Sequence, residues 1–210
     1  MLERLIGLVA PPLCAACGAD AGRATPLCAA CRVELARSAF TGRAPPSASG
    51  LHVWSAFAYD GPAGALVRLL KFGGRVRLAD TMAAQIVAAA PPVVWDGTIV
   101  PVPLHPARLR SRGYNQAAVL GRGLARRRGL PLADCLRQLG GSLPQTGRGR
   151  AARIRGPNGS VTASGAVPAR ALLVDDVVTT GATLAACAKA LRQAGCGNVF
   201  AITYARTSGR

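Results

Sequence analysis

Acidic residues are scarce in this chain. Nine aspartates and glutamates stand against 26 lysines and arginines among 210 residues, which gives a formal net charge of +17 at pH 7. Lys71 and Lys189 are the only lysines, so nearly all of the positive charge is arginine. A GC-rich coding bias accounts for arginine in place of lysine, but not for the shortage of acids. A surplus of this size favours anionic partners such as polyphosphates, nucleic acid or acidic protein surfaces.

Aromatic residues are also few, at 4% of the chain. Proteins usually hold single-stranded nucleic acid with aromatic side chains that stack on bases and with cations that follow the phosphates. The candidates for stacking are Tyr114, Phe72 and Trp54. The composition therefore weakens a base-stacking interface, but it leaves contacts to phosphates open.

The sequence contains no long hydrophobic run. Its least charged stretch, 81–95, is interrupted by two prolines and is too short to span a bilayer. Residues 1–10 include charged side chains and lead directly into a cysteine motif, unlike a signal peptide. We therefore expect no membrane insertion and a cytoplasmic location, where cysteines act as metal ligands or buried thiols rather than forming disulfides.

The strongest pattern that is present covers residues 171–191, ALLVDDVVTTGATLAACAKAL. Its first four residues form a short apolar run of the kind found in buried parallel strands. Asp175 and Asp176 follow, and we expect both at the exposed strand end, where ligands bind in parallel α/β sheets. The loop at 179–183 then opens an amphipathic helix, and free backbone N–H groups at such a helix start suit a phosphate.

Two carboxylates beside a phosphate would repel it unless they bind something else. Vicinal ribose hydroxyls can donate hydrogen bonds to carboxylates, and Mg²⁺ takes both carboxylate and phosphate oxygens. The pattern therefore predicts a ribose 5-phosphate site, with an ordinary strand, loop and helix carrying solvated acids as the alternative. The sequence has no GxxxxGK[ST] loop, and Gly121 and Gly123 lie in a helical pattern rather than after a strand, which argues against a dinucleotide motif.

The segment LLVDDVVTTGAT resembles the phosphoribosyl pyrophosphate (PRPP) motif of type I phosphoribosyltransferases. The resemblance implies that Asp175 and Asp176 are the catalytic acids, which hold the ribose 2′- and 3′-hydroxyls, and that Mg²⁺ binds together with PRPP. It implies a 5′-phosphate cradle made of Thr179, Thr180, Gly181, Ala182 and Thr183.

Strands and helices alternate after a linker at 38–50 that is rich in Ser, Pro, Gly and Ala. We expect strands at 53–59 and 98–102 and helices at 62–72 and 78–90. This alternation predicts an α/β fold with a mostly parallel sheet.

Three arginines follow the second of these strands, in a segment that we predict to be a loop before a helix starting near Tyr114. They are Arg108, Arg110 and Arg112. This loop leaves the carboxyl edge of the sheet, which also carries the two aspartates. The guanidinium groups therefore suit the pyrophosphate of PRPP, and a solvated charged loop is the alternative.

Two CxxC pairs lie near the N-terminus, on either side of a ten-residue segment. Each pair places two thiolates at about the spacing that a tetrahedral Zn²⁺ needs. The segment between them is too small for a core of its own, so a metal would supply folding energy. The pattern predicts a structural zinc ribbon, with a redox pair as the alternative; its ligands are Cys14, Cys17, Cys28 and Cys31. The remaining cysteines, Cys135, Cys187 and Cys196, are expected to be small buried hydrophobes.

Four motifs in order are similar to those of the ComF-type phosphoribosyltransferase-like proteins, which are linked to DNA uptake in naturally competent bacteria. These are the four-cysteine ribbon, PVPLHPARLRSRGYNQA, the segment 139–161 and the PRPP motif. The segment 139–161 resembles the family's mobile loop. The resemblance implies that Arg148, Arg150 and Arg153 in that loop close over the pyrophosphate.

The sequence thus predicts a type I phosphoribosyltransferase fold, an α/β sheet flanked by helices, with a small N-terminal zinc ribbon. We expect the ribbon at 1–45 and the phosphoribosyltransferase-like domain at 46–210. The resemblance implies PRPP binding and transfer of its ribosyl group to an acceptor that no motif identifies, in competence or nucleotide salvage. The alternative is a non-catalytic protein that binds single-stranded DNA, or an adaptor for a DNA-uptake helicase.

Overall fold

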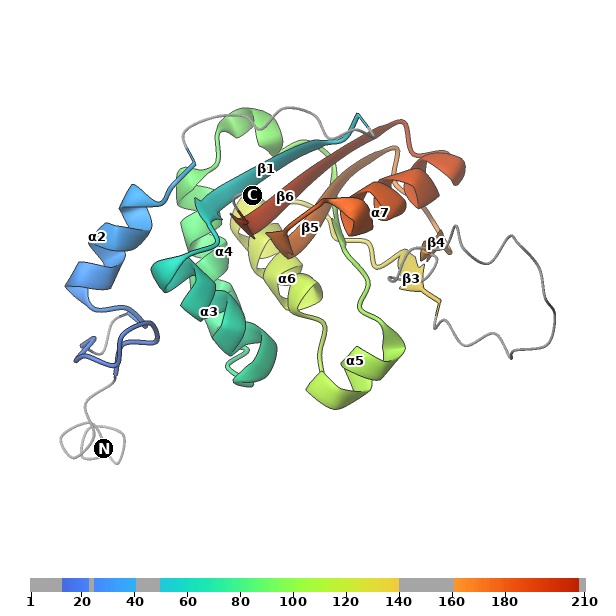
Figure 1. The fold of residues 1–210 in the computed structure, drawn as a ribbon. Helices are drawn as coiled ribbons and strands as arrows, with labels where there is room; N and C mark the ends of the chain where they lie inside the picture. The colour runs from blue at the N-terminus through green and yellow to red at the C-terminus, as the bar shows by residue number, and fades with distance from the viewer. Residues whose placement is uncertain (1–12, 23–24, 41–49, 140–160, 208–210) are drawn as a thin grey trace.

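A parallel sheet of four strands, in the order β1–β6–β5–β2, lies at the centre of the protein (Figure 1). The structure is a computed structural model that describes residues 13–22, 25–40, 50–139 and 161–207. The expected strands at 53–59 and 98–102 are confirmed to within one residue at each end. The bounds are β1 (His52–Ala58), β2 (Thr98–Pro101), β5 (Arg170–Val178) and β6 (Asn198–Arg206).

Helices cover both faces of this sheet (Figure 1). Three of them lie on one face: α3 (Gly61–Phe72), α4 (Leu78–Ala89) and α6 (Gln116–Arg128). On the other face lies α7 (Ala182–Gln193). The α/β class with a parallel sheet, and the helices expected at 62–72 and 78–90, are therefore confirmed.

The side chains of β5 are divided between the two helical layers. Leu172 and Val174 pack with α3, α4 and α6, whereas Ala171 and Leu173 pack with α7. Because both faces of the strand are buried, its sequence is a continuous apolar run rather than an alternating one. The core of the protein therefore consists of two apolar clusters, one on each side of the sheet.

Two glycines let α6 pack closely against its neighbours. A Cβ at Gly121 would lie 3.2 Å from a methyl group of Ile99, and one at Gly123 would lie 2.8 Å from the Cβ of Ala83. These glycines serve helix packing, which agrees with the rejection of a dinucleotide motif at this place.

The arginine-rich segment after β2 is a short helix, α5 (Pro106–Arg112), where we predicted a loop. Pro106 is at the first helical position, where a backbone N–H has no partner within the helix, so proline costs no hydrogen bond. The Nδ1 atom of His105 accepts a hydrogen bond from the N–H of Ala107 at 3.2 Å. Gly113 ends the helix with a φ of 81°, a conformation that favours glycine. These end signals outweigh the lack of an apolar stripe.

The N-terminal region packs directly onto the sheet domain. Its helix α2 (Ala29–Arg37) contacts α3, and Cys31 and Leu35 belong to the same apolar cluster as that helix. Ala39 then forms an antiparallel bridge with Phe57 of β1. The expected domain boundary at 45–46 lies outside the described residues, and it stays a prediction.

Two smaller features complete the described fold. The antiparallel pair β3 (Leu136–Gln138) and β4 (Val161–Ala163) contacts α7, and a 3-10 turn, η1 (Pro92–Val94), follows α4. Among the helices of the described segments, none has both the length and the apolar character needed to cross a bilayer.

Candidate functional site

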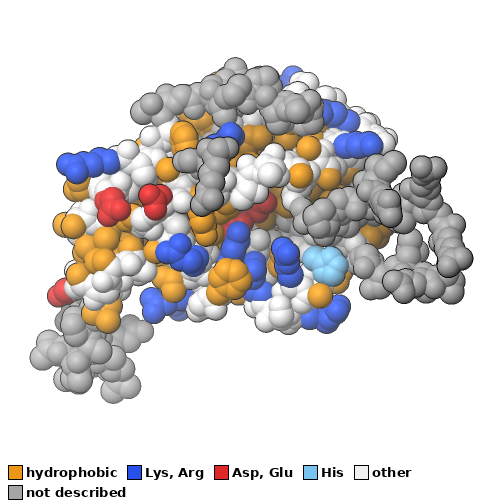
Figure 2. Space-filling model, viewed as in Figure 1, with side chains coloured by type: hydrophobic (Ala, Val, Ile, Leu, Met, Phe, Trp, Pro, Cys, Tyr) orange, Lys and Arg blue, Asp and Glu red, His pale blue; other side chains and the backbone are white. Residues whose placement is uncertain are grey.

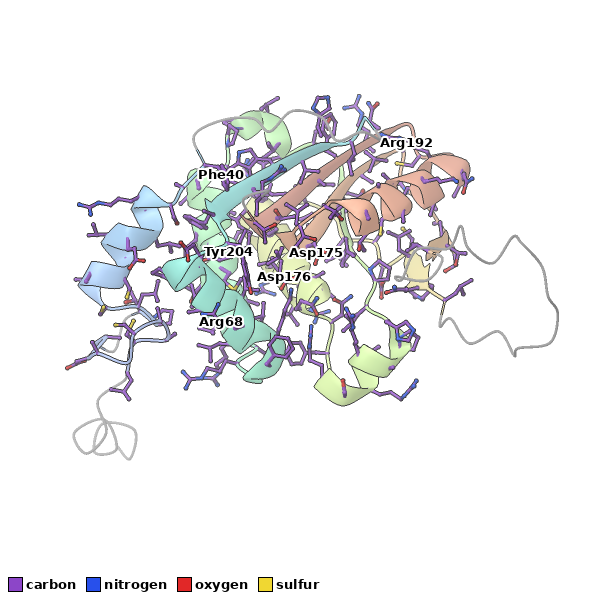
Figure 3. The ribbon with its side chains drawn as sticks, viewed as in Figure 1. Phe40, Arg68, Asp175, Asp176, Arg192 and Tyr204 are labelled. Atoms are coloured by element: carbon purple, nitrogen blue, oxygen red, sulfur yellow. The ribbon has the colours of Figure 1, made fainter. Side chains whose placement is uncertain are left out.

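The two aspartates lie on β5 near its carboxyl end (Figure 3). Neighbouring side chains of a strand point to opposite faces of the sheet, so the two carboxylates serve different surroundings. Asp175 is half-buried and lines a small hollow at the start of α7. Asp176 is only 1% exposed, so the expectation of an exposed strand end is wrong for this residue. The strand continues to Val178, and α3 covers the face to which Asp176 points.

The hollow beside Asp175 has a volume of about 60 Å³ and includes the whole predicted phosphate loop, 179–183. Gly181 caps α7 with a φ of 76°, which places the loop backbone in the left-handed region. The Oγ1 atom of Thr180 accepts a hydrogen bond from the N–H of Ala182 at 3.3 Å. Backbone N–H groups at the start of a helix can bind an anion, and that of Ala182 already donates to Thr180.

Asp176 forms an ion pair with Lys71, a residue that the sequence analysis did not single out. The Nζ atom of Lys71, in the last turn of α3, lies 2.9 Å from Oδ2 of Asp176. The lysine side chain is 24% exposed and the aspartate side chain 2%. The pair therefore joins α3 to the central strand beneath the surface. One signal was available in the sequence, because Lys71 is one of only two lysines and directly follows an apolar helical stripe.

Asp175 has a different electrostatic environment. Burial raises the pKa of its carboxyl group well above the ordinary value of 3.8, and the charge of Asp176 raises it further. The N–H of Asp176, which donates to Oδ1 of Asp175 at 2.8 Å, offsets only part of this, as does Lys71. Asp175 also faces α7, where burial and then its charge raise the pKa of Cys187. One acid of the pair thus has a lysine at contact distance, and the other holds its proton more tightly than usual.

A second, larger cavity of about 640 Å³ lies between the end of α3, α5 and the start of α6. Lys71, Arg108 and Arg112 all line it, while Arg110 is exposed and not part of its lining. Figure 2 shows Lys and Arg side chains gathered around the lower ends of α3 and α5. The cavity is therefore cationic and stands next to the buried carboxylate of Asp176. The predicted pyrophosphate residues Arg148, Arg150 and Arg153 lie outside the described residues.

Aromatic side chains form part of this cavity. Phe72 is 78% exposed, and the guanidinium group of Arg112 lies 5.4 Å from the centre of its ring. Arg112 also donates a hydrogen bond to Oε1 of Gln116, and the hydroxyl of Tyr114 donates to the carbonyl of Leu70. These contacts hold the cavity wall in place. Trp54, by contrast, is buried in the core and cannot stack on a nucleic-acid base.

The four N-terminal cysteines form one cluster, as their spacing predicted. Their Sγ atoms all lie within 4.8 Å of one another, a donor set that fits a tetrahedral metal ion. Burial alone would raise the pKa of Cys14, but hydrogen bonds from the backbone N–H groups of Cys28, Cys17 and Ala16 outweigh it and lower the value to about 6. Burial raises the pKa of Cys31. The cluster could hold a metal such as zinc, and the other three cysteines are buried as expected.

The fold and the site define a mixed α/β protein with a parallel sheet, helices on both faces and a four-cysteine cluster at the N-terminus. No protein-family model matches the chain. The chain is 39% identical over 104 residues to competence protein F of Haemophilus influenzae, an alignment that covers 46% of this chain and 44% of that protein. The chain thus spans less than half the length of this relative. The similarity to ComF-type proteins that the motifs predicted is confirmed by this match.

Solved structures with a similar arrangement include phosphoribosyltransferases. A glutamine PRPP amidotransferase from B. subtilis is 19% identical, with a TM-score of 0.43, over 65% of this chain and 30% of that chain. An adenine phosphoribosyltransferase from Thermoanaerobacter pseudethanolicus is 17% identical, with a TM-score of 0.36, over 67% of this chain and 84% of that chain.

The ion pair between Lys71 and Asp176 generates a stability prediction. Lys71→Met leaves a buried carboxylate without its cation, so we expect the free energy of unfolding to fall by about 3 kcal/mol. Lys189→Met, the matched exposed lysine, is expected to change it by no more than about 0.5 kcal/mol. Denaturant unfolding measures both. Equal small effects for the two lysines would contradict a buried ion pair.

The raised pKa of Asp175 generates a pH prediction. Since the folded chain binds this proton more tightly than the unfolded chain, stability is lost as the pH rises from 3.8 through the folded pKa. Asp175→Asn removes the titrating group and keeps the acceptor oxygen. We expect a higher melting temperature than wild type at pH 7, with the gain shrinking as the pH falls towards 4. A gain that is constant with pH, or a loss at pH 7, would show that Asp175 is not destabilised by its ionisation.

Proposed function

We propose that the chain binds PRPP together with Mg²⁺ at the carboxyl end of β5 and acts as a phosphoribosyltransferase-like protein. The observation that carries the proposal is a series of contacts: Asp175 lines the hollow at 179–183, and its neighbour Asp176 pairs with Lys71, which lines the cationic cavity. The hollow at 179–183 suits the 5-phosphate, the carboxylates of Asp175 and Asp176 suit the ribose hydroxyls, and the cationic cavity suits the pyrophosphate. The relative's name, competence protein F, supports a role in competence, with DNA uptake or nucleotide salvage as the process served.

The carboxylates also bear on Mg²⁺. Asp175 offers carboxylate oxygens beside the phosphate hollow, and hard oxygen donors of this kind fit Mg²⁺. Asp176 could contact Mg²⁺ only if the ammonium group of Lys71 moved away, because the two side chains already form an ion pair. The metal, when bound, would supply charge neutralisation of the pyrophosphate. The residues of this chain would position the sugar, and Arg108 and Arg112 would stabilise the charge that develops on the leaving group.

Calorimetric titration with PRPP and Mg²⁺ tests this proposal. Asp175→Asn/Asp176→Asn removes two charged acceptors for the ribose hydroxyls, so we expect PRPP affinity to fall by at least about 100-fold while the chain stays folded. The matched control is Asp96→Asn/Asp134→Asn, which removes the same charge from exposed surface ion pairs. Equal PRPP affinity in the double mutant and wild type would overturn the ribose assignment.

We also propose that the cysteine cluster is a structural zinc site. Elemental analysis is expected to find one zinc per chain, and Cys14→Ser is expected to lose it. Cys196→Ser is the control, because Cys196 lies outside the cluster and its Sγ donates to carbonyls that a serine can also reach. Folded protein without zinc would contradict the proposal. Four thiolate ligands would fill the coordination shell of the zinc and leave no open position for a substrate. A structural role therefore fits better than a catalytic one.

A second candidate function is binding of single-stranded DNA, as a non-catalytic protein or as an adaptor for a DNA-uptake helicase. The observation that favours it is Phe72, 78% exposed on the wall of the cationic cavity, where a base could stack beside Arg112. Lys71, Arg108 and Arg112 would then bind the phosphates of both DNA and PRPP, so we expect PRPP to compete with the DNA.

Salt dependence tests this second function. Removing one arginine that binds a DNA phosphate lowers the slope of log K against log salt by about 0.7 for a single strand, so Arg108→Ala/Arg110→Ala/Arg112→Ala should flatten it by roughly two units. The control removes three charges from the end of α6, in Arg126→Ala/Arg127→Ala/Arg128→Ala. Two of these arginines pair with Asp80 and the third lies over Trp95. An unchanged slope in the first variant would place DNA binding elsewhere.

A further inference from the structure

Lys71 faces two parts of the site at once. Its Nζ atom is 2.9 Å from Oδ2 of Asp176, and its side chain also lines the cavity that holds Arg108 and Arg112. The contact with Asp176 is an ion pair, and an ammonium group has three N–H donors, so donors remain for a second partner. The same charge can therefore interact with the buried acid or with an anion in the cavity.

The pair differs from the other ion pairs of the described residues. In those pairs the carboxylates of Asp80, Asp96 and Asp134 are 47 to 65% exposed, whereas that of Asp176 is 2% exposed. Exposed pairs are screened by water and salt and exchange partners at little cost. In a pair that is screened so weakly, the attraction between the two charges depends strongly on where each partner lies.

We propose that Lys71 is a positioning residue that couples the two halves of the site, so that an anion in the α3–α5 cavity releases Asp176 for the sugar. The inference rests on the proposed ribose-phosphate function and extends it. When an anion enters the cavity beside Arg108 and Arg112, the ammonium of Lys71 moves towards it. The oxygens of Asp176 then become acceptors for ribose hydroxyls. Reciprocally, a ribose bound to Asp176 frees Lys71 for the anion, because coupling between two sites acts equally in both directions.

This coupling can be tested with two ligands that each represent one half of PRPP. Ribose 5-phosphate and inorganic pyrophosphate are titrated singly and together, without divalent cations, because these would complex the pyrophosphate. In wild type we expect pyrophosphate to tighten ribose 5-phosphate at least about 5-fold more than it does in Lys71→Met. Lys71→Arg, which keeps a cation, should restore part of the effect. Lys189→Met, the control, should behave as wild type.

The outcomes separate the inference from the function on which it rests. If neither ligand binds wild type, the proposed function fails and the inference fails with it. If both bind but the coupling is the same in wild type and Lys71→Met, the inference is overturned while the proposed function stands.

A measurement on the wild-type chain covers the case in which Lys71→Met does not fold. The chain has only two lysines, so ¹³C-labelled lysine gives two side-chain signals, which Lys189→Met assigns. We expect pyrophosphate to shift the Lys71 signal and to leave the Lys189 signal unchanged. An unmoved Lys71 signal at saturating pyrophosphate would overturn the inference.

Discussion

The buried ion pair between Lys71 and Asp176 is the constraint on which the arrangement of this site depends. A carboxylate that is 2% exposed on the central strand is tolerable only with a cation beside it, and α3 supplies that cation from its last turn. The requirement fixes where α3 ends relative to β5. It also brings Phe72 and Lys71 to the rim of the cavity that α5 closes. One electrostatic need thus connects the core of the sheet to the cationic surface.

The alternation of side chains along β5 explains how two adjacent acids can do different work. Asp175 points towards α7 and the hollow at 179–183, and Asp176 points towards α3 and the cationic cavity. A strand at the centre of a parallel sheet reaches both helical layers, so two residues suffice to connect both cavities. The acids also differ in electrostatic environment, because only Asp176 has a lysine at contact distance. Under the proposed function, this difference would let the pair hold a sugar between a phosphate and a pyrophosphate.

Sequence patterns predicted the elements that follow from local rules. The apolar run at 171–174 indicated the buried strand, and the cysteine spacing indicated the cluster. The helix α5 was missed because it has only seven residues, three of them arginines, and carries no apolar stripe, so its stability rests on its two ends. The burial of Asp176 was missed because it depends on α3, which is far away in the sequence. Contacts of that kind are set by the packing of the whole sheet, and only the folded chain shows them.

The most direct test of the account is a crystal structure of the chain with PRPP and Mg²⁺. We expect the 5-phosphate in the hollow at 179–183, the ribose hydroxyls at Asp175 and Asp176, and the pyrophosphate beside Lys71, Arg108 and Arg112. PRPP bound at another place, with the hollow at the start of α7 free of ligand, would contradict it.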